Sequence, residues 1–566
     1  MDAELAARVR AWIAEDPDPE TRAAALAHLE AGDEDWLREG FDSRLAFGTA
    51  GLRGEIGPGP NRMNRCLVRQ VTAGLGSWLS DRPGPVVIGF DGRRGSATFA
   101  RDAAQVLASH GRAVHLYDRL VATPELAFAV VALGAAAGIM VTASHNPPQD
   151  NGYKVYDANG AQVLPPHDTS IAAASLTTPT PPEGPLTDLV RGVPAAVREA
   201  WFTRILATRV RPPATARPLR VVYTAMHGVG YEPIQALWER AGLPPVIPVS
   251  LQVEPDGAFP TVRFPNPEEP GALDLALATA EQTEADLVIA NDPDADRLAV
   301  VVRHRGQYVA LSGNAVGILL ADAHLAAEGT DRPKMVATTI VSTAMLGPVA
   351  EAHGAERVET LTGFKWIGNA ALAHEARGGA FILGFEEALG YSVGSTVRDK
   401  DGVGTALFLV DRATALAADG RTLVDAMDDL YRQHGVFVSV PRSLTRKGAD
   451  GLREIAARMD RLRSSAPREL AGTAVAAIRD IGRGERLDLA SGERTPIDLP
   501  SSNVLAFDLA DGSRALVRPS GTEPKVKFYV EVRQPVDGGD VAAAKAAGMS
   551  RAGLIADALV AASEPA

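Results

Sequence analysis

Residues 139–154 read IMVTASHNPPQDNGYK, and the rest of the chain is arranged around them. The apolar run before Thr142 is typical of a buried strand, and the turn-forming residues after it predict an abrupt loop. Ser144 would then lie at the carboxyl end of the strand, which is the edge of an open α/β sheet where ligands bind. The serine is a candidate for chemistry, although a Ser/Asn/Pro cluster alone is also typical of an ordinary turn.

Size and charge limit the class of protein. The chain has 566 residues, which is too long for one hydrophobic core and predicts about three to five domains. Its 57 Lys and Arg residues are outnumbered by 70 Asp and Glu residues, for a net charge of -13. Because no overall positive field attracts nucleic acid or an anionic membrane surface, we expect neither as a partner.

Cysteine usage and the amino terminus predict a cytoplasmic protein. Cys66 is the only cysteine, which excludes an internal disulfide and a cysteine-cluster metal site. The first four residues, MDAE, are acidic where a secretory signal would be basic. No apolar run reaches the roughly 18 residues of a membrane span. We therefore expect a soluble, enzyme-sized protein in a reducing compartment.

Three strand–loop–helix openings predict three α/β domains of one kind. They begin at residues 86–90, 219–223 and 335–340. Before the first opening, helical periodicity predicts an N-terminal cap of two helices, the second of which ends before Gly40.

After about residue 435 the pattern changes to short strands and helices. Residues 504–509 and 526–532 alternate like strands of an antiparallel sheet, and residues 541–560 form an Ala-rich helical run. The sequence therefore predicts a fourth, smaller α+β domain. The expected domains are residues 1–210, 211–328, 329–435 and 436–566.

A tight turn between two apolar strands carries carboxylates at alternate positions, Asp292, Asp294 and Asp296. Three carboxylates this close repel one another unless a cation lies among them, because like charges raise each other's pKa. Oxygen-only ligation with few donors favours Mg²⁺. A calcium loop of the helix–loop–helix type fails, since Arg297 and Arg303 occupy the positions that require glycine and glutamate. A structural Asp/Pro turn is the other alternative.

Residues 518–525 read RPSGTEPK and lie between two strand-like runs of the fourth domain. Arg518, Ser520, Thr522 and the Gly521 amide are the donors that the oxygens of a phosphate require, and the guanidinium can bind two oxygens at once. The motif predicts a phosphate-binding loop. An ordinary hairpin loop is equally consistent with Ser-Gly-Thr between strands.

Weaker motifs add a sugar-type pair and more cations. Glu386 and Glu387 follow the strand expected at 380–383, and paired glutamates suit hydrogen bonds to vicinal sugar hydroxyls. Lys365 and Lys400 lie in other loops of the same domain. Arg53 is the only charge in FGTAGLRG, residues 47–54, whose glycines leave backbone amides open to an anion.

Four of these loops, TASHNP, DPDADR, FEE and RPSGT, resemble in this order the signature loops of the α-D-phosphohexomutase superfamily, the phosphoglucomutases and phosphomannomutases. The resemblance covers nearly the whole chain. It implies an α/β fold of four domains around a central cleft, three similar mixed α/β domains followed by a smaller α+β domain.

The resemblance also implies roles for individual residues. Ser144 would be a phosphoserine, and Mg²⁺ would be held by its phosphate and by the three aspartates. Proton transfer needs a base near Ser144, for which His145 and Lys154 are candidates, and a pKa lowered by neighbouring cations would suit Lys154 to that task. The other implied residues are the catalytic Arg53 and Lys400, the charge-balancing Arg297, the sugar-binding Glu386 and Glu387, the phosphate-binding Arg518, Ser520, Gly521, Thr522 and Lys525, and Lys365, a substrate-binding residue near that phosphate.

The implied reaction moves a phosphoryl group between the 1- and 6-positions of glucose or mannose phosphate, through a sugar bisphosphate that is both intermediate and activator. Ala388 stands where the commoner hexomutases have serine, and FGTAGLRG and TGFKWIG resemble the branch that contains phosphopentomutases. A phosphopentomutase acting on the 1- and 5-positions of ribose or deoxyribose phosphate is therefore the alternative. A metal-dependent sugar phosphatase and a non-catalytic sugar-phosphate sensor are further hypotheses. The sequence leaves open whether the protein is a monomer or a dimer.

Overall fold

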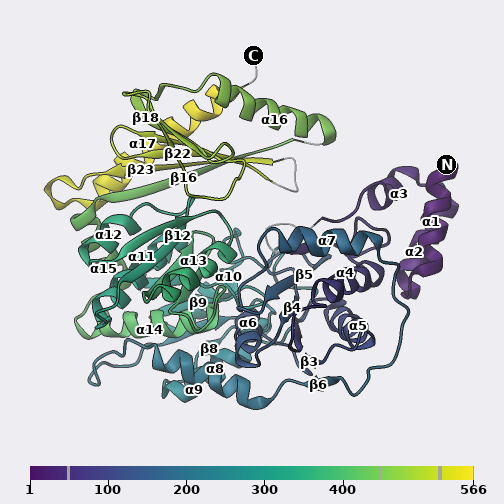
Figure 1. Ribbon diagram of the computed structural model, residues 1–566. Coiled ribbons are helices and arrows are strands. Elements are labelled where there is room, and N and C mark those ends of the chain that lie inside the picture. The colour runs from purple at the N-terminus through teal and green to yellow at the C-terminus, as the bar shows by residue number, and fades with distance from the viewer. Residues whose placement is uncertain (47–50, 447, 521–524, 565–566) are drawn as a thin grey trace. The chain divides into compact units, whose positions relative to one another are not determined.

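The computed structural model describes residues 1–46, 51–446, 448–520 and 525–564 (Figure 1). The chain forms two compact units. The first unit contains residues 1–320 and 363–422, and the second contains residues 321–362 and 423–566. Each unit is therefore built from two segments of the chain.

The first unit contains mixed sheets and the helices that cover them. Its helices are α1 (Ala3–Glu15), α2 (Pro19–Ala31), α3 (Glu34–Phe41), α4 (Arg65–Trp78), α5 (Ser96–Ser109), α6 (Thr123–Ala132), α7 (His167–Thr177), α8 (Ala195–Ala207), α9 (Tyr231–Ala241), η1 (Ser250–Gln252), α10 (Asp274–Thr283), α13 (Phe364–Ala376), α14 (Gly402–Ala418) and the start of α11 (Gly313–Ala327). Its strands are β1 (Leu52–Glu55), β2 (Val86–Phe90), β3 (Val114–Leu116), β4 (Ala137–Val141), β5 (Asp150–Asp157), β6 (Val190–Gly192), β7 (Val221–Thr224), β8 (Ile247–Pro248), β9 (Leu287–Ala290), β10 (Ala299–His304), β11 (Gln307–Leu311), β14 (Ala380–Glu386) and β15 (Gly390–Val393).

The N-terminal cap has three helices where the sequence pattern predicted two. Gly32 ends α2 in the left-handed conformation, with φ 70°, and Asp33 then caps α3 through its side chain. Glycine adopts that conformation without steric cost, and aspartate is a favoured N-cap, so the chain breaks and restarts within two residues. The expected end before Gly40 was also wrong, because α3 continues to Phe41.

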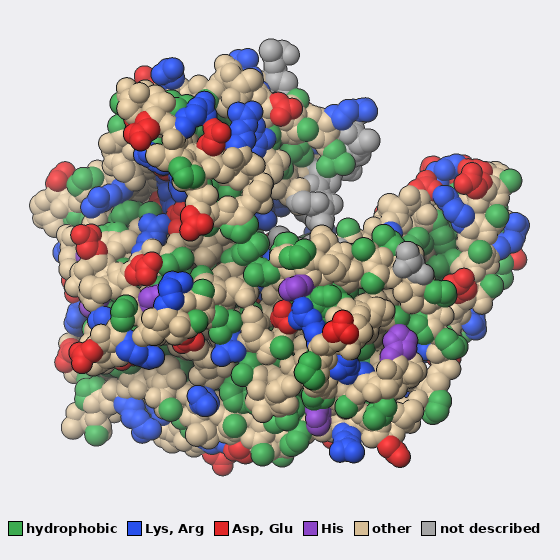
Figure 2. All heavy atoms as spheres, viewed as in Figure 1, with side chains coloured by type: hydrophobic (Ala, Val, Ile, Leu, Met, Phe, Trp, Pro, Cys, Tyr) green, Lys and Arg blue, Asp and Glu red, His purple; other side chains and the backbone are tan. Residues whose placement is uncertain are grey.

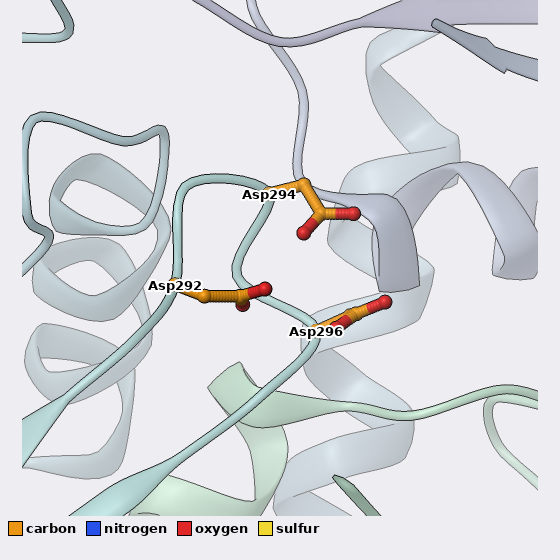
Figure 3. Close-up of side chains that lie close together, drawn as sticks. All are labelled: Asp292, Asp294 and Asp296. Carbon is orange, nitrogen blue, oxygen red and sulfur yellow. The ribbon is translucent and has the colours of Figure 1, made fainter. Parts of the chain in front are cut away.

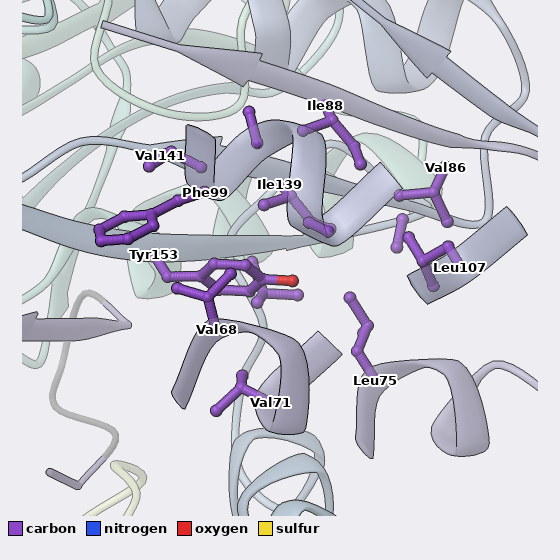
Figure 4. Packing of buried hydrophobic residues seen from close by; sticks show 14 of the residues in the cluster. Val68, Val71, Leu75, Val86, Ile88, Phe99, Leu107, Ile139, Val141 and Tyr153 are labelled. Atoms are coloured by element: carbon purple, nitrogen blue, oxygen red, sulfur yellow. The ribbon is translucent and has the colours of Figure 1, made fainter. Parts of the chain in front are cut away.

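The first sheet has the strand order β1-β5-β4-β2-β3-β6. Its central strands β2 and β4 are parallel, with Ile88 opposite Ile139 and Phe90 opposite Val141. Apolar side chains from these strands and from α4 and α5 form the core seen in Figure 4. Because the two strands are parallel, the loops that follow them leave the same edge of the sheet. The loop with Ser144 therefore lies beside residues 91–95.

The second sheet, of order β11-β10-β9-β7-β8, supports the aspartate-rich loop between β9 and β10. Two glycines allow other segments to approach this loop closely. A Cβ atom on Gly228 would lie 2.4 Å from the Cα atom of Pro293, and one on Gly402 would lie 2.3 Å from the carbonyl oxygen of Arg297. Any side chain at either position would push the loop out of place, because such separations are well inside van der Waals contact.

The second unit contains a parallel strand pair and a larger sheet. Its helices are the end of α11, α12 (Leu346–Ala352), α15 (Leu423–His434), α16 (Gly448–Ser464), η2 (Asp537–Gly539) and α17 (Val541–Ala562). Its strands are β12 (Lys334–Thr339), β13 (Glu356–Thr360), β16 (Val436–Thr445), β17 (Glu469–Leu470), β18 (Thr473–Asp480), β19 (Glu485–Asp488), β20 (Arg494–Pro496), β21 (Leu505–Leu509), β22 (Arg514–Pro519) and β23 (Lys525–Gln534).

The antiparallel sheet predicted after residue 435 is confirmed. It has the order β16-β23-β22-β21-β18-β19-β20, with β17 paired to β18. The strands expected at 504–509 and 526–532 are β21 and β23, and the Ala-rich run forms α17, which packs on β16 and β23. Their alternating apolar side chains form the core of this part of the second unit.

Glu359 on β13 is the centre of an ion cluster in the second unit. Its carboxylate accepts hydrogen bonds from Arg357 (2.6 Å), Arg479 (2.6 Å) and Arg514 (3.2 Å). Burial raises the pKa of Glu359, but the arginines outweigh burial, and the net pKa is lowered. Because β13 carries the glutamate while Arg479 and Arg514 come from β18 and β22, the cluster joins the two sheets of this unit.

We expect Glu359→Gln to destabilise the second unit by about 2–3 kcal/mol, because one buried and two partly buried guanidinium groups lose their shared carboxylate. Because folding lowers the pKa of Glu359, its ionised carboxylate stabilises the folded state fully at pH values above its ordinary pKa of 4.5. This stabilisation is lost as the pH falls through the lowered pKa of the folded state. In urea unfolding, the free energy of unfolding of wild type should therefore exceed that of the variant at neutral pH, and the difference should disappear in acid. The control is Glu485→Gln, which breaks an exposed pair with Arg494 and should cost less than about 0.5 kcal/mol. A difference in the free energy of unfolding that does not change with pH would contradict the stabilising role of the ionised Glu359 carboxylate.

Candidate active site

Ser144 is held in an unusual backbone conformation on the loop between β4 and β5. Its φ is 53°, in the left-handed region that residues other than glycine seldom adopt. Its side chain is buried, and its hydroxyl donates a hydrogen bond to Asp292 Oδ2 at 2.8 Å. His145 Nδ1 lies 3.1 Å from the same oxygen of Ser144. The serine predicted from the sequence thus lies between a carboxylate and an imidazole.

The loop between β9 and β10 directs three carboxylates to the same side, as Figure 3 shows. One oxygen each from Asp292, Asp294 and Asp296 lies within 4.8 Å of the others, and all three residues are buried. The loop is closed at its base, where the Asn291 side-chain amide donates to the carbonyl oxygen of Arg297. The Arg297 amide donates to Asp292 Oδ1 at 3.0 Å. These bonds fix the direction of the first carboxylate.

Two lysines face the aspartates. Lys154 Nζ lies 2.6 Å from Asp294 Oδ2 and 3.0 Å from Asp296 Oδ2. Lys400 Nζ lies 3.3 Å from Asp296 Oδ2, and Asp399 holds it from the other side at 3.1 Å. Lys154 comes from β5 and Lys400 from the segment before α14, so residues far apart in the sequence meet at one buried cluster.

The charges of this cluster shift one another's pKa. Burial, and then repulsion from Asp294 and Asp296, raises the pKa of Asp292 well above its ordinary value. Burial would also raise the pKa of Asp294, but Lys154 outweighs burial and the pKa is lowered. For Lys154, burial alone would lower the pKa, but Asp294 and Asp296 outweigh it and the pKa is raised. Lys400 and Arg53 do lower the pKa of Lys154, but without a metal ion the two aspartates outweigh them, and Lys154 keeps its proton.

The aspartate cluster fits a hard divalent cation. Asp294 Oδ1 and Asp296 Oδ1 are buried, and neither has a hydrogen-bond donor within the described part of the chain. Such oxygens are costly to bury without a partner, and carboxylate oxygens are the ligands that Mg²⁺ prefers. The high pKa of Asp292 points the same way, because an added cation would relieve the repulsion that causes it.

His145 and Arg53 complete the surroundings of Ser144. Burial, followed by repulsion from Arg297 and Arg53, lowers the pKa of His145 well below its ordinary value, so the imidazole is neutral. Arg53 lies on β1, opposite Gly152 of β5. Its Nε atom is buried and has no acceptor among the residues that the structure describes. The guanidinium is therefore placed to bind an anion at this site.

The predicted sugar-binding residues lie in the same unit. Glu386 ends β14, which continues beyond the strand expected at 380–383, and its Oε1 accepts a hydrogen bond from the Gly363 amide at 2.8 Å. Burial raises the pKa of Glu386. Glu387 follows on the turn to β15 and is partly exposed. Lys365, at the start of α13, pairs with Asp168 of α7 at 3.6 Å.

The predicted phosphate-binding residues belong to the second unit. Arg518 lies on β22, opposite Lys527 of β23, and the Ser520 amide donates to the Lys525 carbonyl oxygen at 2.7 Å. The strand–loop–strand setting predicted for this motif is confirmed. Gly521 and Thr522 lie outside the described residues.

Sequence reasoning missed Asp399 as part of the site. Its carboxylate accepts hydrogen bonds from Tyr156 (2.7 Å) and Gln162 (2.7 Å), and its other oxygen faces Lys400. Three partners fix this buried carboxylate, which in turn orients Lys400 toward Asp296. The one signal in the sequence is that Asp399 directly precedes Lys400, for which the resemblance implies a catalytic role.

The surface and the helices add two observations. Among the described residues, none of the helices combines the length and the apolar character that a bilayer span requires. On the face drawn in Figure 2, basic and acidic side chains are interspersed rather than gathered into one basic patch.

Four family models match the chain in order. Residues 44–180, 199–306 and 312–434 match "Phosphoglucomutase/phosphomannomutase, alpha/beta/alpha domain I", "domain II" and "domain III", and residues 454–547 match the C-terminal domain of the same family. The predicted architecture of three similar α/β domains and a smaller C-terminal domain is confirmed. The domain limits given above remain a prediction.

Similar proteins carry mutase names. A probable phosphomannomutase of Haemophilus influenzae is 42% identical over 83% of this chain and 93% of its own length. A phosphopentomutase of Homo sapiens is 35% identical over 95% of this chain and 93% of its own length. A phosphoglucomutase of Staphylococcus haemolyticus is 36% identical over 87% of this chain and 91% of its own length.

A solved structure agrees with these relatives. The putative phosphomannomutase of Thermus thermophilus is 25% identical, with a TM-score of 0.66, and the match covers 90% of this chain and 99% of that one. Fold, motif order and relatives together show that the chain belongs to the phosphoglucomutase/phosphomannomutase family and is an isomerase of the intramolecular phosphotransferase class.

Proposed function

We propose that the protein moves a phosphoryl group between the 1- and 6-positions of a hexose phosphate, glucose or mannose, by way of a phosphoserine at Ser144 and a sugar bisphosphate. The observation that carries this proposal is the contact of the Ser144 hydroxyl with Asp292 inside the aspartate cluster. A serine hydroxyl is a poor nucleophile by itself, whereas a stored phosphoryl group needs mainly positioning and charge compensation. The buried cations and carboxylates supply both.

Each residue has a task in this reaction. His145 is neutral and 3.1 Å from Ser144 Oγ, so it is the better placed of the two candidate bases, while Lys154 holds its proton and neutralises Asp294 and Asp296. Arg53 and Arg297 would bind the oxygens of the phosphoryl group as it transfers. Mg²⁺ held by the three aspartates and the Ser144 phosphate would supply further charge compensation.

Other residues would bind the sugar hydroxyls and the phosphate that does not react. Glu386 and Glu387 would bind sugar hydroxyls, with Lys365 at the start of α13 and Lys400 on the segment before α14. Arg518, Ser520, Gly521, Thr522 and Lys525 would bind the phosphate that does not react. Between the two half-reactions the sugar bisphosphate would reverse its orientation in the site, and it would then return its other phosphate to Ser144. The presence of a single cysteine, Cys66, supports a reducing, cytoplasmic location for this enzyme.

A phosphopentomutase is the second candidate. Ala388 removes a hydroxyl donor from the sugar-binding loop, and the phosphopentomutase relative spans 95% of this chain. The relatives described above are all named mutases, so the phosphatase and the sensor find no support among them.

A substrate panel tests the proposal. Purified protein with Mg²⁺ and a catalytic amount of the matching bisphosphate is given the 1-phosphates of glucose, mannose, ribose and deoxyribose, and products are separated from inorganic phosphate. We expect isomerised sugar phosphate, with a hexose preferred by kcat/KM. A pentose preference would establish the second candidate, and release of inorganic phosphate without isomer would overturn mutase function.

A further inference from the structure

Arg93 is buried beneath the loop that carries Ser144. It follows β2, and its side chain is fully shielded from solvent. One terminal nitrogen, Nη2, donates to the carbonyl oxygens of Ser144 (2.6 Å) and Asn146 (2.5 Å). The other, Nη1, donates to those of Pro147 (2.8 Å) and Asp150 (3.1 Å). One guanidinium therefore binds four backbone oxygens of a single loop.

Arg93 is itself fixed on the opposite side. Asp91 Oδ1 accepts the Arg93 amide at 3.0 Å and the Ser96 hydroxyl at 2.7 Å. Asn151, at the start of β5, donates to Ser96 Oγ at 3.0 Å, and the guanidinium lies over the Phe259 ring, 4.9 Å from its centre. The residue thus belongs to a rigid support and does not reach solvent.

The loop depends on this support because of its backbone conformation. Ser144 has a φ of 53°, which is unfavourable for a residue with a Cβ atom and persists only where the surroundings enforce it. Within the described ranges, Arg93 is the one hydrogen-bond donor to the carbonyl oxygens of Ser144 and Asn146. Removing the guanidinium would leave both oxygens without this partner, the Ser144 oxygen in a buried place and the Asn146 oxygen in a partly buried one.

We propose that Arg93 is a positioning residue that holds Ser144 in its left-handed conformation, so that its hydroxyl or phosphoryl group stays against the aspartate cluster. This inference rests on the proposed function of Ser144 as phosphoryl carrier. Arg93 contacts only the backbone of the loop, so it acts through geometry. The planar fork of arginine can span four oxygens from two nitrogens, whereas the single ammonium of lysine cannot.

The test compares Arg93→Gln and Arg93→Lys with a matched control, Arg94→Gln. The Arg94 side chain is largely exposed, and the contact of Arg94 with Asn151 is made by its backbone carbonyl oxygen. Because the substitution leaves that oxygen in place, the control should behave as wild type. We expect Arg93→Gln to lower kcat about 10²-fold with KM changed little, because the reacting group is misplaced and substrate binding is not. The rate at which the labelled sugar bisphosphate phosphorylates Ser144 should fall by the same factor, and Arg93→Lys should recover part of the loss.

A second measurement does not depend on turnover. Amide hydrogen exchange, followed by mass spectrometry, should be faster by about tenfold in a peptide spanning residues 142–150 of Arg93→Gln, with the rest of the chain unchanged. If Arg93→Gln fails to fold, both the kinetic measurement and the hydrogen-exchange measurement are made on Arg93→Lys. The inference would be overturned if the Arg93 variants exchanged the amides of residues 142–150, and phosphorylated Ser144, at the same rates as wild type. If wild type itself does not phosphorylate Ser144, the proposed function fails, and the exchange of residues 142–150 decides the role of Arg93 separately.

Discussion

Ser144→Ala should lower kcat by about 10⁴-fold or more, because the residue proposed to carry the phosphoryl group is lost while the rest of the site is unchanged. The substitution removes one hydroxyl from a buried position and leaves the carboxylate of Asp292 without that donor. Since the Arg297 amide still binds Asp292, we expect the fold to be retained.

Intact mass separates the proposed role from a merely structural one. The wild-type protein, isolated or after incubation with the sugar bisphosphate, should carry one phosphoryl group, and Ser144→Ala should carry none. Ser170→Ala is a suitable control, because the Ser170 hydroxyl donates only to the nearby carbonyl oxygen of Pro166, just before α7. This variant should keep the phosphoryl group and full activity. Phosphate mapped to another residue of the wild type would refute the mechanism.

Asp292→Asn should have opposite effects on activity and on stability. The pKa of Asp292 is raised because its charge is buried beside two others, so the charged form is a cost to the metal-free fold. An amide keeps the shape and removes the charge, and the metal-free variant should unfold at the same temperature as wild type or higher. Activity should fall by about 10³-fold, since a proposed metal ligand next to the reacting oxygen is lost.

The comparison with and without Mg²⁺ measures both effects. Wild type should gain thermal stability on addition of Mg²⁺, because a ligand that binds only the folded state stabilises it. Asp292→Asn should gain much less, whereas Asp188→Asn, at an exposed position before β6, should respond as wild type. An Mg²⁺-dependent gain in Asp292→Asn equal to that of wild type would show that Asp292 is not a ligand.

The sequence predicted those parts of the fold and site that depend on local pattern. Alternating apolar residues placed β21 and β23, and the alternate spacing of the three aspartates predicted that their carboxylates gather at one turn. Pattern could not place Arg93, because its partners lie about fifty residues later and meet it only when β2 and β4 pair in parallel. Nor could pattern give the direction of the pKa shift of Lys154, which depends on the carboxylates of Asp294 and Asp296 about 140 residues later.

The division of the chain has a consequence for the order of events at the ribosome. β12 and β13 are synthesised before residues 363–422, yet they belong to the second unit, whose remaining strands all come after residue 422. Domains generally fold as units while the chain emerges. The first unit can therefore complete its core around β14 while β12 and β13 still lack the arginines of β18 and β22 that neutralise Glu359. Until the last quarter of the chain has been made, Glu359 therefore remains without two of the three arginines that bind it.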